Sequence, residues 1–168
     1  ENNITSEVLV RSTEFLLPSD IEKVPIHEIF KRIATSEPRN SQILFDVSAA
    51  IENGRSPLIL TERTEHLELL QKLLGENGVD AIVLRGGMGK RQRMEAMKRI
   101  NDTAEVSRRV VLATGRYIGE GFDDSKLDTL FLAMPISWSG TLQQYVGRLH
   151  RMRSDKSLLQ VEQPNKFP

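Results

Sequence analysis

The sequence contains no cysteine among its 168 residues. Disulfide bridges, thiolate zinc sites and cysteine nucleophiles are therefore excluded, and the composition fits a cytoplasmic protein. Aromatic residues are few, and we interpret the one tryptophan, Trp138, as a loop or interface residue rather than a stacking platform. The longest apolar stretch, TLFLAMPI, is far shorter than the roughly 20 residues that cross a bilayer, and no signal peptide opens the chain, so we expect no membrane segment.

An excess of charge is also lacking, because the formal net charge is zero. The two halves of the chain nevertheless differ. Residues 1–84 carry eight basic and 14 acidic side chains, whereas residues 85–168 carry 15 basic and nine acidic ones. We therefore expect any anion-binding surface to come largely from the second half.

Short apolar runs alternate with longer amphipathic ones along the chain. The short runs predict buried parallel strands over residues 57–60, 81–85, 109–113 and 129–133. Between them, leucine spacing predicts a helix over 65–78, and a second helix is expected over 90–102 with Met94, Met97 and Ile100 on its apolar face. This alternation predicts an α/β fold built from βαβ units.

The remaining segments complete the predicted organisation. Residues 24–54 predict two helices that part near Glu37 and Pro38, and SLLQV near the C-terminus predicts a further strand. Residues 6–18 predict a strand left from a preceding unit, so we divide the chain into an N-terminal segment, 1–23, and one domain, 24–168. Residue 1 is Glu rather than Met, and we expect the chain to be a piece of a longer protein.

Two features suggest a phosphate-binding loop and a metal site, but neither has the required spacing. The stretch LRGGMGKRQ resembles a phosphate loop, but Arg91 occupies the hydroxyl position of a Walker A motif and Leu84 the first glycine position. The glycines do not fit a dinucleotide-binding pattern either. The three histidines are scattered without metal-ligand spacing, so no metal site is predicted.

The segment TLQQYVGRLHRMR (141–153) has three arginines beside a glycine. On a helical wheel, Gln144, Arg148 and Arg151 fall within roughly 60° of one another, opposite the apolar side chains. A solvated basic face near a helix C-terminus would explain them without any ligand. Gly147 favours a ligand, because glycine inside a helix costs about 1 kcal/mol and lets another group approach the backbone.

Two of the predicted strands end in loops with polar side chains. Strand 109–113 leads into TGRYIGEGFDD (114–124), and strand 57–60 leads into TERTEH, which contains Thr61 and Arg63. Ligands of α/β sheets bind outside the carboxyl ends of the strands, where both loops must lie. A long surface turn would require the same glycines and acids, so that alternative stays open.

These residues together resemble a known family. ATGRYIGEGFD (113–123), followed about twenty residues later by QQYVGRLHR (143–151), resembles motifs V and VI of the superfamily-two, DEAD/DEAH-type helicases and translocases. Gln144, Gly147, Arg148 and Arg151 match the motif VI pattern, and LILTERTEH resembles motif IV. The likeness spans roughly residues 55–155. The GEGFD form is most similar to the type III restriction-subunit and repair-type branch.

The resemblance implies a three-layer RecA-like domain, similar to P-loop NTPases, with a mainly parallel sheet flanked by helices. It would be the second of two such domains, with ATP and Mg²⁺ held mainly by the first. Arg151 is then the expected arginine finger, with Arg148 beside it and Gln144 facing the attacking water or the partner domain. Gly121 and Asp123 would contribute to the nucleotide site.

The resemblance also implies a nucleic-acid strand as second ligand, DNA favoured over RNA. Its sugar-phosphate backbone would lie along small polar groups and exposed amides that recognise phosphate without reading sequence. The residues expected there are Thr61, Arg63, Gly86, Gly87, Lys90 and Thr114. Arg91 and Arg93 would extend the positive track, although a solvated helix face explains them equally well.

Several partners and one rival interpretation follow. The expected partners are an N-terminal RecA-like domain of the same protein, nucleic acid, and a nuclease or methylase, with no membrane. Because Walker A and Walker B are missing, the chain alone should have negligible ATPase activity. The rival is a free-standing α/β nucleic-acid-binding or regulatory module with no motor. A nucleotide-binding domain of another enzyme fits less well, because none of the glycine patterns matches one.

Overall fold

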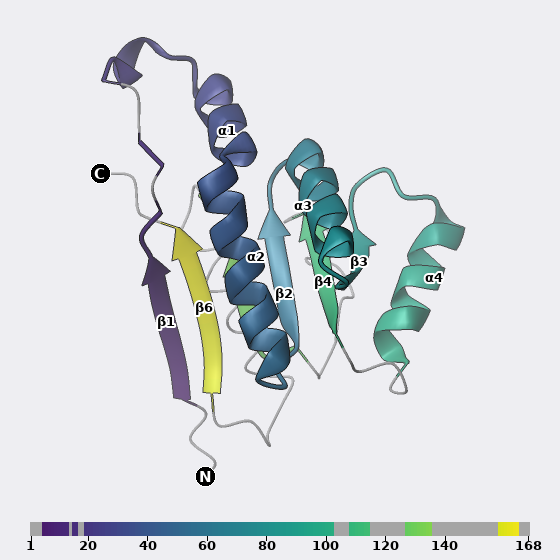
Figure 1. Cartoon of the computed structure of the whole chain (residues 1–168). Helices are drawn as coiled ribbons and strands as arrows, with labels where there is room; N and C mark the ends of the chain where they lie inside the picture. The colour runs from purple at the N-terminus through teal and green to yellow at the C-terminus, as the bar shows by residue number, and fades with distance from the viewer. Residues whose placement is uncertain are drawn as a thin grey trace.

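A computed structural model describes residues 5–13, 15–16, 19–102, 108–114, 127–135 and 158–164. The described residues form a six-stranded sheet in which every neighbouring pair is parallel, in the order β1-β6-β5-β2-β4-β3 (Figure 1). The strands are β1 (Thr5–Arg11), β2 (Pro57–Thr61), β3 (Asp80–Leu84), β4 (Arg109–Thr114), β5 (Thr129–Leu132) and β6 (Leu158–Pro164). The helices are the short 3-10 helix η1 (Ile21–Lys23), α1 (Ile26–Thr35), α2 (Glu37–Glu52), α3 (Thr64–Glu76) and α4 (Lys90–Asn101).

The predicted α/β fold is confirmed. The four strands expected in the middle of the chain are β2, β3, β4 and β5, and the predicted C-terminal strand is β6. The break expected near Glu37 and Pro38 lies at Ser36, and Pro38 occupies the first turn of α2, where a missing N–H costs no helix bond. None of the described helices is both long and apolar enough to cross a membrane.

Helices cover both faces of the sheet. Helices α2 and α3 lie on one face and α4 on the other (Figure 1). The strands are buried on both sides because their side chains alternate: Ile59 packs with α2 and α3, whereas Leu58 and Leu60 face the α4 side. Helix α3 inserts Leu67, Leu70 and Leu74 into this core and ends before Gly78, whose φ of 71° suits a residue without Cβ.

Two sequence predictions were wrong in detail. Met94 is 63% exposed, because the buried stripe of α4 is centred on Ala96 and Ile100, with Met97 beside it. The strand expected over 6–18 ends at Arg11, where its partner in β6 is Pro164. Proline has no N–H to donate and commonly limits a ladder.

The first and last strands of the sequence lie side by side at one side of the sheet. β1 pairs with β6 along its whole length, although the two strands come from opposite ends of the sequence (Figure 1). Arg11, the last residue of β1, forms a bidentate ion pair with the buried Asp46 of α2, with Nε–Oδ2 at 3.0 Å and Nη2–Oδ1 at 2.5 Å. Such pairs fix orientation as well as distance. The boundary predicted between residues 23 and 24 stays a prediction.

The α3 side of the core provides a test of the packing. We expect Leu70→Ala to lower the free energy of unfolding by about 3 kcal/mol, because Leu70 is fully buried and truncation leaves a cavity. Denaturant unfolding of the chain would measure this loss. The control Met94→Ala, at an exposed helix position, should change stability by less than about 0.5 kcal/mol. Equal losses in the two variants would contradict the packing described here.

Candidate nucleic-acid interface at the carboxyl edge of the sheet

The carboxyl ends of the strands bring several predicted site residues together. Thr61, the last residue of β2, is the direct partner of Thr114, the last residue of β4. β3 runs beside β4 with Leu84 opposite Ala113, so Gly86 and Gly87 follow just beyond the same edge. Three segments that are far apart in the sequence therefore meet along one line, the upper edge of the sheet in Figure 1.

The predicted nucleotide site lies outside the described residues. This applies to every residue assigned to ATP or to catalysis: Gly121, Asp123, Gln144, Arg148 and Arg151. Their roles stay predictions. Among the residues that the structure does describe, no group of three or more His, Asp or Glu side chains is arranged to hold a metal ion.

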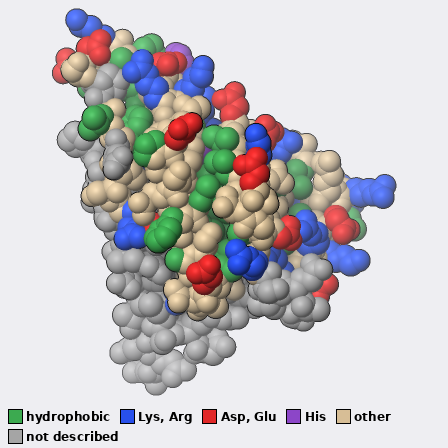
Figure 2. Space-filling model, in the orientation of Figure 1, with side chains coloured by type: hydrophobic (Ala, Val, Ile, Leu, Met, Phe, Trp, Pro, Cys, Tyr) green, Lys and Arg blue, Asp and Glu red, His purple; other side chains and the backbone are tan. Residues whose placement is uncertain are grey.

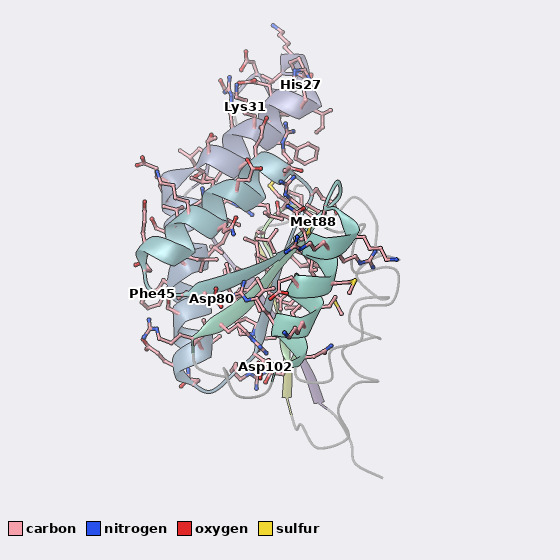
Figure 3. The ribbon with its side chains drawn as sticks, turned by 90° about the vertical axis from the view of Figure 1, so that its right-hand side faces the viewer. His27, Lys31, Phe45, Asp80, Met88 and Asp102 are labelled. Atoms are coloured by element: carbon pink, nitrogen blue, oxygen red, sulfur yellow. The ribbon has the colours of Figure 1, made fainter. Side chains whose placement is uncertain are left out.

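The loop after β3 is open and rich in glycine. Gly86 and Gly87 are exposed, and Gly87 has a φ of 79°, which L side chains rarely adopt. The Arg85 N–H donates to the sulfur of Met88 at 3.3 Å, and the Gly89 N–H donates to Gln92 Oε1 at 3.2 Å. Figure 3 shows Met88 beside the end of α4 that follows this loop. The loop is thus held by a hydrogen bond at each end, and its two central glycines are exposed, with open space around Gly87.

Helix α4 begins with an unusual concentration of positive charge. Its first turn contains no acidic residue and starts with the exposed side chains of Lys90 and Arg91. Acidic residues normally favour this position, because the N-terminus of a helix already carries a partial positive charge. In Figure 2, basic side chains gather along the edge of the molecule formed by α4. This distribution of charge is favourable for an anion near the glycine loop.

Arg63 contributes a positive charge to the same edge, and this charge is partly buried and lies near a carboxylate. It is the residue before α3, its side chain is 31% exposed, and its Nη2 lies 3.9 Å from Glu65 Oε2. Arg85 lies 4.0 Å from Glu68 in a similar way. Pairs at this distance in solvent contribute little to stability, so both guanidinium groups can exchange partners with an external phosphate.

Beneath this edge lies a chain of buried polar side chains. Thr61 Oγ1 lies 3.0 Å from His66 Nδ1, and His66 Nε2 lies 2.9 Å from Asn40 Oδ1. Asn40 Nδ2 in turn donates to the Ala34 carbonyl at 2.9 Å. Asn40 Oδ1 can only accept a hydrogen bond, so His66 donates from Nε2. His66 Nδ1 then accepts a hydrogen bond from the Thr61 hydroxyl group. Every polar atom named here is satisfied when His66 is neutral.

Burial keeps His66 in that neutral form. Its side chain is 1% exposed, and desolvation, reinforced by the positive charge of Arg39, lowers the pKa of His66 to about 3. Thr61 is itself only 2% exposed. Its hydroxyl group is therefore committed to α3 in this structure, and Thr114, which is half-buried, offers the more accessible hydroxyl of the pair.

Arg39, the neighbour of Asn40 in α2, is buried at the same edge. It is 2% exposed, and burial lowers its pKa to about 10. Its Nη2 donates to the carbonyl of Ala133, directly after β5, at 2.6 Å. Its Nη1 has no hydrogen-bond partner within the described part of the chain. Sequence reasoning missed Arg39, Asn40 and His66, although helical spacing from Val47 and from Leu70 places them on the buried faces of α2 and α3.

A family comparison agrees with this architecture. The model of the helicase conserved C-terminal domain matches residues 40–153. This match covers more than half of the chain, and the chain therefore belongs to that family. The predicted resemblance to the C-terminal domain of helicases is confirmed at this level.

Individual relatives are more distant. Transcript termination protein A18 of cowpox virus (strain Brighton Red) and transcript termination protein OPG145 of variola virus are each 28% identical over 123 residues, 72% of this chain and 24% of theirs. The chain thus spans about a quarter of the length of these curated relatives. Two solved structures share the fold. T4 UvsW has a TM-score of 0.72 and 15% identity, over 97% of this chain and 32% of that one. The C-terminal part of the Fun30 ATPase domain has a TM-score of 0.66 and 11% identity, over 88% of this chain and 52% of that one.

The burial of His66 predicts a stability that depends on pH. The pKa of His66 is about 3 in the folded chain, against about 6.5 when unfolded, so below pH 6.5 the unfolded chain binds a proton that the folded chain does not. The contribution of His66 to the free energy of unfolding is fully present above pH 6.5 and decreases as the pH is lowered. At pH 5 the loss should be about 2 kcal/mol. Denaturant unfolding of wild type and His66→Gln at pH 7 and pH 5 would isolate the effect.

A matched histidine provides the control. His27 is exposed on α1, so His27→Gln should lose as much stability between pH 7 and pH 5 as the wild type loses. The His66→Gln variant should lose about 2 kcal/mol less than wild type over that interval. An equal loss in all three proteins would mean that His66 is not buried as a neutral side chain.

Proposed function

We propose that this domain is the second motor domain of an ATP-dependent nucleic-acid helicase or translocase. Membership of the helicase C-terminal family supports the proposal. The observation that carries it is the meeting of Thr61, Thr114 and the loop at Gly86 and Gly87 on one edge, next to the basic start of α4. Backbone amides, hydroxyl groups and cations in one row suit a phosphate backbone, and they require no particular base sequence.

The nucleotide half of the proposal concerns the segments that resemble motifs V and VI. Arg151 would act as the arginine finger and Arg148 would bind beside it, because guanidinium groups bind phosphate oxygens in pairs and neutralise charge that develops during transfer. Gly121 and Asp123 would line the nucleotide, and Gln144 would face the attacking water or the partner domain. ATP and Mg²⁺ would be held mainly by an N-terminal RecA-like domain, which carries the Walker motifs.

Movement follows from the two halves acting together. Closing of the two RecA-like domains on ATP would bring the finger to the γ-phosphate and tighten the hold on the strand. Opening after hydrolysis would release that hold. In this scheme the domain needs its partner for catalysis, and the chain alone should hydrolyse ATP at a negligible rate.

The compartment that we propose is the cytoplasm, which the lack of cysteine in the sequence favours.

The biological setting has two candidates. The GEGFD form favours the restriction-subunit and repair-type branch, and with it DNA as the track and a nuclease or methylase partner. The names of the poxvirus relatives favour a motor that acts on a transcription complex, at 28% identity over 72% of the chain. ATP-dependent termination of transcripts would support the second setting, and ATP-dependent cleavage of DNA by a co-purified nuclease would support the first.

A free-standing binding module is the rival to any motor. A Walker A loop and an acidic Walker B box upstream of Glu1 in the gene would favour the motor, and an unrelated domain or a stop codon there would favour the module. A free-standing module should bind nucleic acid without any ATPase activity.

The arginine finger predicts a loss of hydrolysis without a loss of binding. In the full-length protein, Arg151→Ala should bind ATP nearly as well as wild type but hydrolyse it on the order of 10³ times more slowly, because the finger acts mainly in the transition state. Nucleotide titration and steady-state ATPase assays would separate the two effects. An unchanged hydrolysis rate would remove Arg151 from the catalytic site.

The start of α4 predicts a salt-dependent loss of nucleic-acid binding. Replacing Lys90 and Arg91 together by Gln should weaken binding to single-stranded oligonucleotides at low salt and reduce the slope of log K against log salt by about 1.4, because two phosphate contacts are lost. Lys98 and Arg99 provide the matched control, since they are an adjacent Lys-Arg pair on the same helix but in its last turn. Equal weakening by both double variants would indicate a general charge effect rather than a site at this edge.

A further inference from the structure

Two arginines donate hydrogen bonds to β5 or to the residue that follows it, one at each edge of the sheet. At the amino edge, Arg55 Nε donates to Thr129 Oγ1 at 3.0 Å, and its guanidinium group lies 3.6 Å from the carboxylate of Asp128. At the carboxyl edge, within the described residues, Arg39 of α2 donates only to the Ala133 carbonyl. The Arg55 contact joins the start of β2 to β5, whereas the Arg39 contact joins α2 to the end of β5, and only the Arg55 contact includes a carboxylate among the described residues.

The carboxylate beside Arg55 gives Arg55 and Arg39 different roles. A buried cation is costly when no anion compensates it, and replacing it by an apolar side chain of similar volume is often neutral or stabilising. Arg39 is less exposed than Arg55, it lacks a described carboxylate partner, and its Nη1 is unused within the described residues. Stability therefore accounts for Arg55 but does not account for a charged residue at position 39.

The contacts of Arg39 join two segments that the proposed function needs. Ala133 receives the Arg39 bond at its carbonyl, and its N–H donates to the Leu60 carbonyl at 2.8 Å. Leu60 precedes Thr61, which is linked through His66 to Asn40, the neighbour of Arg39. The end of β2, the start of α2 and the residue after β5 thus form one closed set of hydrogen bonds. The chain after Ala133 leads within twenty residues to Arg148 and Arg151.

We propose that Arg39 is a positioning residue that couples nucleic-acid binding at the end of β2 to the segment that follows β5. Phosphate binding at Thr114 and the glycine loop would shift the end of β2, where Thr61 lies opposite Thr114, and so displace His66 and Asn40 and turn the start of α2. Arg39 would then move the Ala133 carbonyl, at the start of the stretch of sequence that leads to Arg148 and Arg151. The inference rests on the proposed motor function, but it concerns a residue that contacts neither ligand.

The test uses Arg39→Met in the full-length protein, with ATPase activity measured against the concentration of single-stranded oligonucleotide. The rate at saturating oligonucleotide should fall about tenfold, whereas the oligonucleotide Kd should stay within about threefold of wild type. The thermal midpoint should not fall, because an apolar side chain replaces an uncompensated buried charge. Arg39→Lys, which keeps a cationic donor for the Ala133 carbonyl, should recover part of the lost rate.

Arg55→Met is the matched control. It removes the same functional group from the opposite end of β5, where Asp128 balances the charge, so it should lower the thermal midpoint and leave the stimulation by oligonucleotide unchanged. A structural role for Arg39 predicts the same pattern for Arg39→Met as for Arg55→Met, and that result would overturn the inference. If Arg39→Met does not fold, Arg39→Gln, which keeps an N–H donor without the charge, takes its place. Its stimulated rate should still fall below that of wild type with the oligonucleotide Kd within about threefold, and an unchanged rate would overturn the inference.

A double variant tests whether the contacts act as one set. If Arg39 and Thr61 belong to one network, Arg39→Met combined with Thr61→Val should reduce the stimulated rate about as much as the more damaging single change. Losses that multiply would show two independent effects and overturn the inference. A wild-type protein with no oligonucleotide-stimulated ATPase would instead contradict the proposed function itself, so the two failures can be told apart.

Discussion

The position of β2 between β4 and β5 is the constraint on which the candidate site depends. All five residues of β2 are buried, and the strand is paired in parallel on both sides. Because Thr61 lies opposite Thr114 and Leu60 lies opposite Leu132, the segments that leave β2, β4 and β5 start at the same level. A shift of one residue in either register would turn Thr61 away from α3 and separate the three segments.

The two edges of this strand group differ in their electrostatics. At the amino edge, Asp128 accepts the Ser56 N–H at 2.8 Å and balances Arg55. At the carboxyl edge the buried polar groups are a neutral chain from Thr61 to Asn40 and the cation of Arg39. On the surface of this edge are the loosely paired Arg63 and Arg85, with their partners Glu65 and Glu68, and the basic start of α4. The apolar clusters on the two faces of the sheet fix the positions of the strands. The distribution of charge makes the carboxyl edge better suited than the amino edge to an anionic ligand.

Much of the fold could be predicted from local pattern, because short apolar runs and leucine spacing report directly on burial. The pattern failed where burial depends on a partner distant in sequence: Met94 has helical spacing but lies outside the stripe that the sheet covers, and the end of β1 is set by Pro164 of β6. The meeting of Thr61 and Thr114 followed from the rule that parallel strands end at one edge. Arg39 and His66 could not be found by counting polar residues. Helical spacing indicates that both are buried, but their hydrogen-bond partners become known only when α2 and α3 are placed on the sheet.

The most direct test of the central claim is an NMR titration of the chain with a single-stranded oligonucleotide, followed through backbone amides. We expect the largest shifts at Thr61, Gly86, Gly87 and Thr114, and little change at Gly54, Ser56 and Asp128 on the opposite edge. Shifts confined to the amino edge, or no shifts at low salt, would contradict the assignment of the carboxyl edge as the nucleic-acid interface.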